Sequence, residues 1–192
     1  MSVAVEIGAG HTARPDFFTR RYDEYYVVDN DPERLAWGRY EGTYLRPVLA
    51  DAANLDFADC SVDVVLARNV FGHAVLGFNP DQESHWHELR YATKRGQASR
   101  RERKELTEIN NGIFEKKVAI MHEAARILVE GGKLVSVDYY TPQYATDFFT
   151  ALETLPIHER PCLTVEEVAL SSVAKPHYAE HDTRSKTWVA VK

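Results

Sequence analysis

The sequence predicts an α/β fold of three layers, in which a mostly parallel sheet is wound with helices on both faces. Short apolar runs rich in β-branched residues alternate along the chain with segments of helical periodicity. These runs are apolar at nearly consecutive positions, which is typical of strands covered on both faces. Since strand and helix alternation joins parallel strands, we expect one doubly wound domain over residues 1–192.

The expected strands are read from these apolar runs. They are VAVEI at 3–7, YYVVD at 25–29, RPVLA at 46–50, VDVVLA at 62–67, KLVSVD at 133–138 and a last strand in TWVAVK at the end of the chain. Each run is bounded by glycine, proline or polar residues that favour turns.

Helices are expected from capping signals and periodicity between the strands. They are a short helix near Pro15–Tyr22, one opened by Asp31 and Pro32, an apolar stripe from Leu106 to Leu128 that ends at Gly131–Gly132, one capped by Thr141 before Pro142, and a short one behind the capping box Thr164-x-x-Glu167.

Composition limits the class of protein. With 44% apolar and 27% charged residues the chain is an ordinary globular domain, and its net charge of −6 argues against nucleic acid or an anionic membrane as its main partner. Cys60 and Cys162 are too few for a disulfide framework or a zinc cluster. No run approaches a membrane span of about 20 residues and no signal peptide precedes the first strand, so we expect a cytoplasmic protein.

A glycine turn follows the first strand. Gly8, Gly10 and Ala13 match the pattern G-x-G-x-x-G/A, in which a strand runs into a nucleotide-binding turn. Asp29 ends the second strand, where a carboxylate accepts hydrogen bonds from both ribose hydroxyls. These features suit NAD and S-adenosylmethionine equally.

Two further acidic residues favour S-adenosylmethionine over NAD. Glu6 makes the turn E-x-G-x-G, and Asp51 follows the third strand, where its carboxylate accepts from an adenine amine while the Ala52 N–H reaches a ring nitrogen. The stretches VEIGAGHT, VVDNDP, ADAANLDFADCSVDVVLARNVFGH and EAARILVEGGKLVSVD, in that order, resemble class I S-adenosylmethionine-dependent methyltransferases.

The resemblance implies a Rossmann-like sheet of seven strands with an antiparallel last strand. It also implies how the first part of the chain binds the cofactor. Gly8 and Gly10 would let the backbone approach the methionine and ribose, and Glu6 would hold the turn or the methionine amine. Asp29 would bind the ribose hydroxyls and Asn30 would lie against the adenine.

The remaining cofactor residues implied by the resemblance follow the third and fourth strands. Asp51 and Ala52 would bind the adenine edge, and Arg68 and Asn69 would border the methionine and its sulfur. No metal is expected, because His85 and His87 are two residues apart on a helix and point in different directions.

Substrate residues are expected at the same edge of the sheet. His73 corresponds in place to a residue that faces the substrate in many family members, although a purely structural histidine is the alternative. Tyr139 and Tyr140 directly follow the fifth strand, where ligands bind in open sheets. They are expected as walls of the substrate pocket.

A helical insertion at about 74–117 lengthens the connection between the fourth and fifth strands beyond the usual family pattern. Six basic residues crowd its centre: Lys94, Arg95, Arg100, Arg101, Arg103 and Lys104. We expect the family's helix before the first strand to be missing, because Met1 and Ser2 alone precede Val3 in this sequence. We therefore expect the insertion to be a lid over the cofactor or a docking segment for a partner protein or a second subunit, with a solvated loop as the plain alternative.

The sequence thus predicts S-adenosylmethionine-dependent methyl transfer to an oxygen or nitrogen of a small-molecule acceptor, with His73 as the catalytic base. Two alternatives stay open. One is a non-catalytic or partner-dependent module that binds S-adenosylmethionine. The other is an NAD-dependent oxidoreductase, which the missing Y-x-x-x-K pair disfavours.

Overall fold

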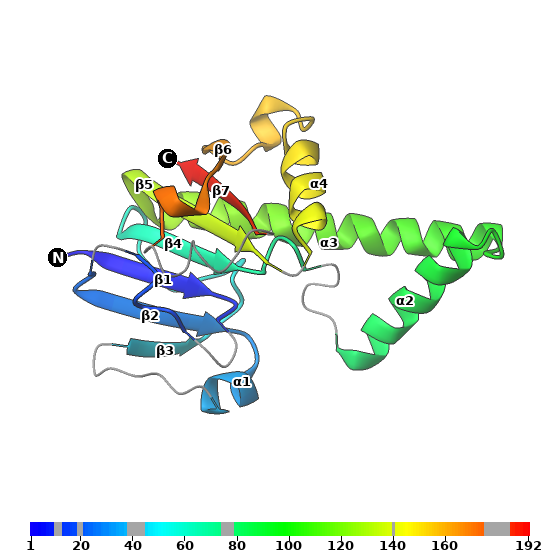
Figure 1. Ribbon diagram of the computed structural model, residues 1–192, viewed down its shortest axis with the longest axis horizontal. Helices are drawn as coiled ribbons and strands as arrows, with labels where there is room; N and C mark the ends of the chain where they lie inside the picture. The colour runs from blue at the N-terminus through cyan, green and yellow to red at the C-terminus, as the bar shows by residue number, and fades with distance from the viewer. Residues whose placement is uncertain (10–12, 19–20, 38–44, 74–78, 140, 175–184) are drawn as a thin grey trace.

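The fold is a seven-stranded sheet with helices packed against it (Figure 1). The computed structural model describes the chain except residues 10–12, 19–20, 38–44, 74–78, 140 and 175–184. Its strands are β1 (Val3–Ile7), β2 (Glu24–Asp29), β3 (Leu45–Leu49), β4 (Val62–Arg68), β5 (Leu128–Asp138), β6 (Thr164–Val168) and β7 (Lys186–Val191).

The strand order is β3-β2-β1-β4-β5-β7-β6. The pairs from β3 to β5 are parallel, whereas β7 runs antiparallel to both of its neighbours, as expected for the last strand. The order reverses between β1 and β4, so the carboxyl ends of these two strands form the topological switch point at which open sheets bind ligands. The predicted fold class is confirmed.

The helices are α1 (Pro32–Trp37), α2 (Pro80–Lys94), α3 (Arg100–Ile127), α4 (Pro142–Leu152) and the 3-10 turns η1 (Ile157–Glu159) and η2 (Leu170–Ser172). Figure 1 shows α3 and α4 against one side of the sheet. None of the helices in the described ranges is long and apolar enough to cross a membrane.

The two faces of the sheet are covered differently. On one face, Val65 and Trp188 pack with Ile120 and Met121 of α3 and with Phe149 of α4 in the larger core. The other face packs against Leu35 of α1, against Leu170 of η2 and against irregular chain that includes Phe17 and Phe18. The alternation of side chains along each strand divides the apolar runs between these two cores.

The helix expected near Pro15–Tyr22 is wrong for the residues described there. Residues 13–18 and 21–22 contain no helix: residues 15 and 16 form a turn, and Phe18 makes an isolated antiparallel bridge with Ala174. Phe17 and Phe18 are both buried in the smaller core, whereas consecutive side chains on a helix point about 100° apart. Burial of both rings against the sheet therefore outweighs the local helical pattern.

The short helix expected behind Thr164-x-x-Glu167 is also wrong. These residues form β6, which pairs with β7 over the register Thr164 to Val191 through Val168 to Thr187. A capping box satisfies two backbone N–H groups, while the ladder with β7 satisfies the backbone along the whole segment. The pairing partner lies too far along the sequence to be seen locally.

The apolar helix before β5 ends earlier than expected. α3 stops at Ile127, and Gly131 and Gly132 lie within β5. Gly131 has φ +74° and its N–H donates to the Lys192 carbonyl, where the register between β4 and β5 shifts. The two glycines thus form an irregularity in the strand, for which a positive φ is readily available to glycine.

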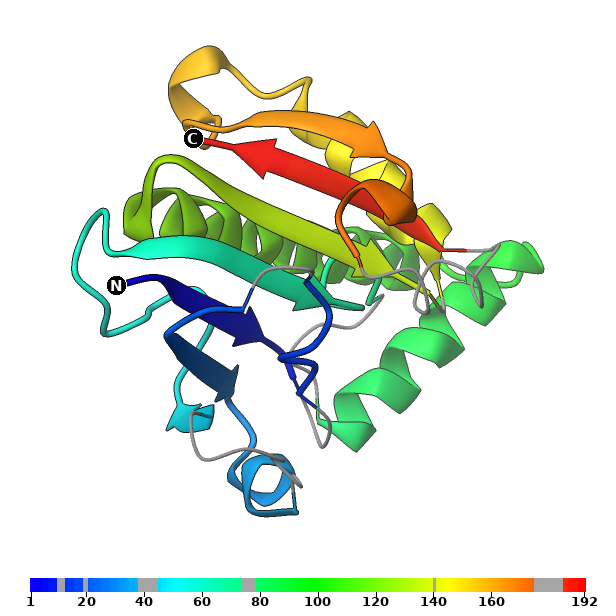
Figure 2. The same ribbon diagram turned by 60° about the vertical axis from the view of Figure 1, so that its left-hand side comes forward.

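The insertion folds into a helical arm, which we define as α2 and the first half of α3, residues 80–94 and 100–113. Figures 1 and 2 show this arm extending beyond the carboxyl ends of β1 and β4. Trp86, Leu89, Leu106 and Ile113 form a small core between its two helices. Asn79 and Ser99 begin the helices with complete capping boxes. We call residues Lys94–Lys104 the basic tip.

Candidate cofactor and acceptor site

The glycine turn after β1 lies at the switch point. Gly8 has φ +63° and its N–H donates to the Val28 carbonyl of β2 at 2.9 Å. A Cβ built on Gly8 would lie 2.8 Å from a methyl carbon of Val70. The turn therefore needs glycine at this position, for its conformation and for its space. Gly10 lies outside the described residues.

Glu6 lies beneath this turn and is fully buried. Its carboxylate accepts hydrogen bonds from the Arg14 N–H and the Tyr25 hydroxyl, both at 2.7 Å. Arg68 at the end of β4 donates from Nε at 2.7 Å and forms an ion pair of 2.5 Å with the same carboxylate. Of the two roles predicted for Glu6, this complete burial favours holding the turn. Arg68 is thereby positioned at the edge where the methionine was predicted.

The end of β2 carries the predicted ribose ligand. Asp29 is buried, and its Oδ1 accepts the Asp31 N–H at 3.0 Å. Asp31 in turn accepts the Glu33 N–H at 2.9 Å and so begins α1. Asn30, between them, is exposed. The chain turns sharply here, which leaves Asp29 and Asn30 beside the carboxyl end of β1.

Asp51 and Ala52 follow the edge strand β3. Asp51 accepts the Ala53 N–H at 3.0 Å and the Lys116 ammonium of α3 at 3.1 Å. Partial burial raises the pKa of the Asp51 carboxyl, but the Ala53 and Lys116 contacts outweigh it and leave this pKa below its ordinary value. The carboxylate is therefore ionised at neutral pH, as an acceptor for an adenine amine requires.

Asn69 joins the ends of β4 and β5. It has φ +56°, its N–H donates to the Val137 carbonyl at 2.9 Å, and its side-chain Oδ1 accepts the Tyr139 N–H at 2.7 Å. Asparagine tolerates this left-handed conformation better than most residues. The predicted pocket residue Tyr139 is thus held beside Asn69. Tyr140 lies outside the described residues.

A buried polar network that sequence reasoning missed holds the turn after β4. The Lys117 ammonium donates to the Phe71 carbonyl at 2.6 Å, and the Asp138 carboxylate accepts the Gly72 N–H at 2.6 Å and the Ser136 hydroxyl at 2.8 Å. A Cβ on Gly72 would lie 2.6 Å from Asp138 Oδ1. The polar groups of this turn are therefore satisfied by side chains of α3 and β5.

Burial shifts the titration of both charged groups in this network. It lowers the pKa of Lys117 to about 8, against the effect of the nearby Asp138. It raises the pKa of Asp138 to about 6, although the Ser136 hydroxyl, the Gly72 N–H and Lys117 all lower it. One signal pointed to Lys117, because it interrupts the apolar stripe of Ile113, Ile120 and Met121 with a charge at helical spacing.

His73 is the next residue after this braced turn and is exposed. Desolvation lowers the pKa of its imidazole; Glu83 of α2 raises it, and Lys117 and Arg34 lower it further, so that it lies below the ordinary 6.5. The ring is therefore mainly neutral at pH 7 and able to accept a proton.

The residues present fit a nucleoside cofactor with an amino-acid tail. The strands β1, β2 and β3 lie side by side (Figure 1). The glycine turn, the Asp29 carboxylate and the ionised Asp51 follow or end these strands at their carboxyl ends. This set offers an open backbone and acceptors for a ribose diol and an adenine amine. In the described part of the chain, no three His, Cys, Asp or Glu side chains gather as a metal site.

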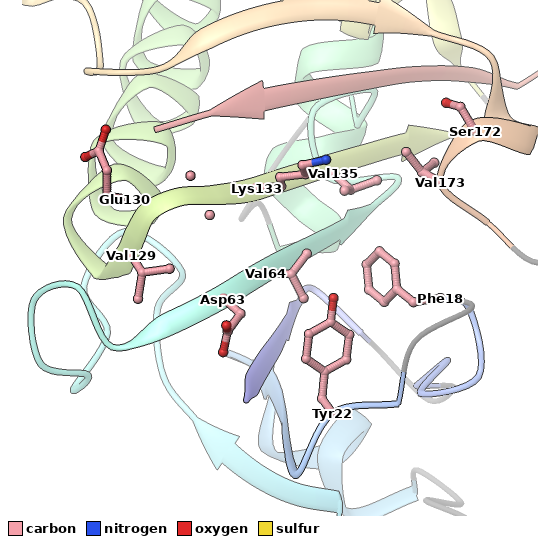
Figure 3. Close-up of a pocket in the computed structure, with 12 residues that line it drawn as sticks. Phe18, Tyr22, Asp63, Val64, Val129, Glu130, Lys133, Val135, Ser172 and Val173 are labelled. Atoms are coloured by element: carbon pink, nitrogen blue, oxygen red, sulfur yellow. The ribbon is translucent and has the colours of Figure 1, made fainter. Parts of the chain in front are cut away.

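A separate cavity of about 380 Å³ lies on the face of the sheet that α3 does not cover (Figure 3). Phe18, Tyr22 and Val173 line it opposite Val64 and Val135. None of the predicted cofactor or substrate residues lines it.

Comparison with known proteins agrees with this geometry. The model of a family described as "Methyltransferase domain" matches residues 5–98. These residues run from the middle of β1 through β4 and include all the cofactor residues predicted above. No curated protein matches the sequence.

Solved structures share the fold at low sequence identity. The N-methyltransferase NodS from Bradyrhizobium japonicum, crystallised with S-adenosyl-L-homocysteine, matches with TM-score 0.56 and 13% identity, covering 100% of this chain and 78% of its own. A chain of the complex between the Haloferax volcanii Trm112 methyltransferase activator and a methyltransferase matches with TM-score 0.52 and 16% identity, covering 99% and 81%. A protein described as an rRNA methylase from Clostridium thermocellum matches with TM-score 0.51 and 13% identity, covering 100% and 86%.

The fold agrees with the family resemblance in its strand order, its antiparallel β7 and its glycine turn. The matching family model agrees with it as well. The protein is therefore a methyltransferase with the Rossmann-like class I fold, and its cofactor is S-adenosylmethionine.

Proposed function

We propose that this enzyme methylates an oxygen or nitrogen atom of a small-molecule acceptor and that His73 accepts the acceptor's proton. One observation carries the proposal. The glycine turn of β1, Asp29 of β2 and the braced turn that ends in His73 after β4 meet at the carboxyl edge of adjacent strands. A cofactor bound by the glycine turn and Asp29 would lie next to an acceptor bound near His73.

We assign the cofactor contacts as follows. The backbone at Gly8 and Gly10 faces the methionine and ribose, Asp29 accepts from the ribose hydroxyls, and Arg68 with Asn69 borders the methionine. Asn30 lies against the adenine, and Asp51 with the Ala52 N–H contacts its edge. The support is the buried carboxylate of Asp29 beside an exposed glycine turn, and the ionised Asp51 at the next strand end.

When bound, S-adenosylmethionine supplies a methyl group on a positively charged sulfur, which a lone pair of the acceptor takes up. The protein then has to orient the acceptor and, for a hydroxyl, take its proton. His73 suits this task, because its lowered pKa keeps the imidazole neutral at pH 7. Lys117 and Asp138 hold the turn that carries it.

Tyr139 and Tyr140 are proposed as walls on the acceptor side. The half-buried Tyr139 is held by the Asn69 side chain at the end of β5. NodS, described as an N-methyltransferase, and the protein described as an rRNA methylase share this fold with different acceptors. A small acceptor is favoured here because the net charge of −6 opposes close approach of a polyanion to most of the surface.

The basic tip is proposed as a docking site for a second protein chain, either a second copy or another partner. It carries six basic residues and one acid, and only Lys104 is ion-paired, with Glu108 at 3.5 Å, among the described residues of the tip. The Haloferax volcanii complex contains a methyltransferase with an activator. A module that acts only with a partner is therefore the second candidate function.

Binding of S-adenosyl-L-homocysteine and of NAD⁺, measured by calorimetry, tests the cofactor assignment. We expect micromolar binding of the former and none of the latter, and the reverse result contradicts the proposal. Transfer of radiolabelled methyl groups to a panel of phenols and amines, with and without a partner captured on the basic tip, then separates an autonomous enzyme from a partner-dependent module.

A further inference from the structure

One face of α2 carries three polar residues, the last of which contacts α4. Glu83, His87 and Arg90 are spaced four and three residues apart and share this face. His87 Nε2 lies 3.7 Å from Glu83 Oε1. Glu83 acts on the titration of His73, and Arg90 lies over the ring of Tyr144 in α4. α2 runs out to the start of α3 (Figure 1), and Arg90 near that end brings this face of α2 against the first turn of α4.

Arg90 is held between two aromatic rings. The carbon at the centre of its guanidinium group lies 5.1 Å from the centroid of Trp86 and 5.1 Å from that of Tyr144. Trp86 is buried and is oriented by the hydrogen bond from its Nε1 to Asn110 Oδ1 at 2.9 Å. Both ring contacts are within the range of a cation–π interaction. The guanidinium is therefore positioned before any ligand arrives.

Three arginines on or against the sheet are paired with carboxylates. Arg46 pairs with Glu24 at 2.7 Å, Arg68 with Glu6 at 2.5 Å, and Arg126 with carboxylates at 2.6 Å. Within the described ranges, Arg90 forms neither an ion pair nor a hydrogen bond to a carboxylate, and it is exposed. Among the described residues, Arg95 also lacks an acidic partner, but it lies over one ring only, that of Tyr91, at 4.1 Å. A guanidinium with rings on its faces keeps its N–H donors at its rim, where their fork matches a carboxylate or phosphate.

A short chain of contacts connects Arg90 to the proposed base. Tyr144, beneath Arg90, donates its N–H to the Thr141 carbonyl at 3.1 Å. The Thr141 hydroxyl donates to the Gly72 carbonyl, and His73 follows Gly72. The positioned guanidinium and the proposed base therefore belong to the same side of the sheet edge.

We propose that Arg90 binds an oxyanion, a carboxylate or a phosphate group, of the methyl acceptor. This inference rests on the proposed function and deepens it, because it names the chemical class of the acceptor. An acceptor with its nucleophilic atom at His73 and its anionic group at Arg90 would be oriented at two points. The two rings hold the arginine in place, so little side-chain entropy is lost when the anion binds.

The test measures anion binding directly and does not need the true acceptor. Benzoate, phenyl phosphate and neutral benzamide are titrated into the protein saturated with S-adenosyl-L-homocysteine, and the Arg90 Nε–H signal is followed by NMR. We expect benzoate or phenyl phosphate to shift this signal with an affinity at least ten times that of benzamide. The preferred anion identifies the oxyanion.

Two variants make the test specific. R90M should lose at least tenfold in affinity for the preferred anion, while R90K, which keeps the charge, should lose less. R100M, which removes an arginine of the basic tip, is the matched control and should bind as the parent does. Equal losses in R90M and R100M, or no response of the Arg90 signal to either anion, would overturn the inference.

The two proposals fail in distinguishable ways. A parent protein that does not bind S-adenosyl-L-homocysteine contradicts the proposed function. The anion titration is then repeated in the absence of S-adenosyl-L-homocysteine. A parent that binds S-adenosyl-L-homocysteine but no anion at Arg90 contradicts only the inference on the acceptor. The melting temperature of R90M shows whether the substitution weakens the packing of α2 against α4. If it does, the affinity of R90K for the preferred anion supports or overturns the inference.

Discussion

At the scale of single residues, substitution of Asp29 tests the cofactor site most directly. Asp29→Ala should weaken binding of S-adenosyl-L-homocysteine by about 1.5–3 kcal/mol, because a charge-assisted hydrogen bond to the ribose is lost. Calorimetry measures this change. Asp147→Ala, which removes an exposed carboxylate of α4, is the control. Unchanged affinity in Asp29→Ala would contradict the ribose assignment.

His73 is tested by the rate of methyl transfer to a hydroxyl acceptor. Because the pKa of His73 lies below 6.5, the rate should rise with pH through a midpoint below that value and stay level at neutral pH. His73→Ala should lower turnover about 100-fold or more and abolish this rise, with little effect on cofactor affinity. His158→Ala removes an exposed histidine in η1 and should change neither. A full rate in His73→Ala would return His73 to a structural role.

The raised pKa of Asp138 predicts that the stability of the protein depends on pH. Its folded pKa of about 6 lies above the ordinary 3.8, so the stability that it contributes is complete below pH 3.8 and is lost as the pH rises through 6. Relative to Asp138→Asn, the parent should lose on the order of 2 kcal/mol of unfolding free energy between pH 4 and 7. Urea titrations at several pH values measure this difference.

Ser136→Ala is the matched variant for this experiment. It keeps the Asp138 carboxyl but removes a hydroxyl that lowers its pKa, so the same loss of stability should occur at a higher pH. Parallel stability curves for the parent and Asp138→Asn would show that the carboxyl does not titrate in this range.

The residues at strand ends could be predicted from sequence because their signals are local. Gly8 breaks an apolar strand, and Asp29 and Asp51 each follow one, so their positions at the sheet edge depend only on the strands being parallel. The Lys117–Asp138 network could not be predicted in the same way. It needs α3 to pack against the turn after β4 and β5, and this depends on the whole fold.

At the scale of elements, the arm should be less stable than the half of α3 that lies on the sheet. Only a small core holds its two helices, whereas Ile120, Met121 and Ala124 belong to the main core. We expect slow amide exchange over Val118–Leu128 and faster exchange over Lys94–Arg103 in the free protein. Protection of Lys94–Arg103 by a partner or by cofactor with acceptor would mark it as a docking segment or lid.

Ser99→Ala sharpens this prediction. It removes the cap of α3, which is worth about 1 kcal/mol, and should speed exchange at the basic tip about fivefold while Val118–Leu128 is unchanged. Ser84→Ala lies within α2 and should have no such effect. Equal exchange rates along the whole of α3 would contradict a separately stable arm.

Element types were predictable where the pattern and the partner are close in sequence. The strands of the parallel half match their local signals. α4 begins after Thr141 as expected, but the Thr141 hydroxyl donates to the Gly72 carbonyl and does not cap the helix. The segments Pro15–Tyr22 and Thr164–Glu167 carry helix-like signals too, but Phe17 and Phe18 are buried together and β6 pairs with β7. In both cases a contact with a distant segment outweighs a local preference of a few tenths of a kcal/mol to about 1 kcal/mol.

At the scale of the whole molecule, charge is distributed unevenly. The chain has a net charge of −6, while the basic tip alone carries six basic residues against one acid. The rest of a second copy is therefore acidic on balance and would attract the tip. Sedimentation at low salt should show a mass above the 21.9 kDa of one chain, and high salt should restore that value, because screening weakens such contacts.

Charge reversal at the tip separates this association from a general charge effect. R100E/R103E should stay a single chain at low salt, with unchanged binding of S-adenosyl-L-homocysteine. R46E/K133E, which reverses two exposed charges away from the arm, should associate as the parent does. A parent that sediments as one chain at all salt concentrations would leave a different protein as the occupant of the tip.

The continuity of α3 has a mechanical consequence. Its 28 residues make one rod of about 42 Å, with the basic tip at one end and the buried Lys117 in its second half. Since the Lys117 ammonium is bonded to the Phe71 carbonyl at 2.6 Å, a twist or tilt applied at the tip is transmitted to the turn that precedes His73. A partner that binds the basic tip would therefore move the turn before His73. The protein would then transfer methyl groups at different rates with and without this partner.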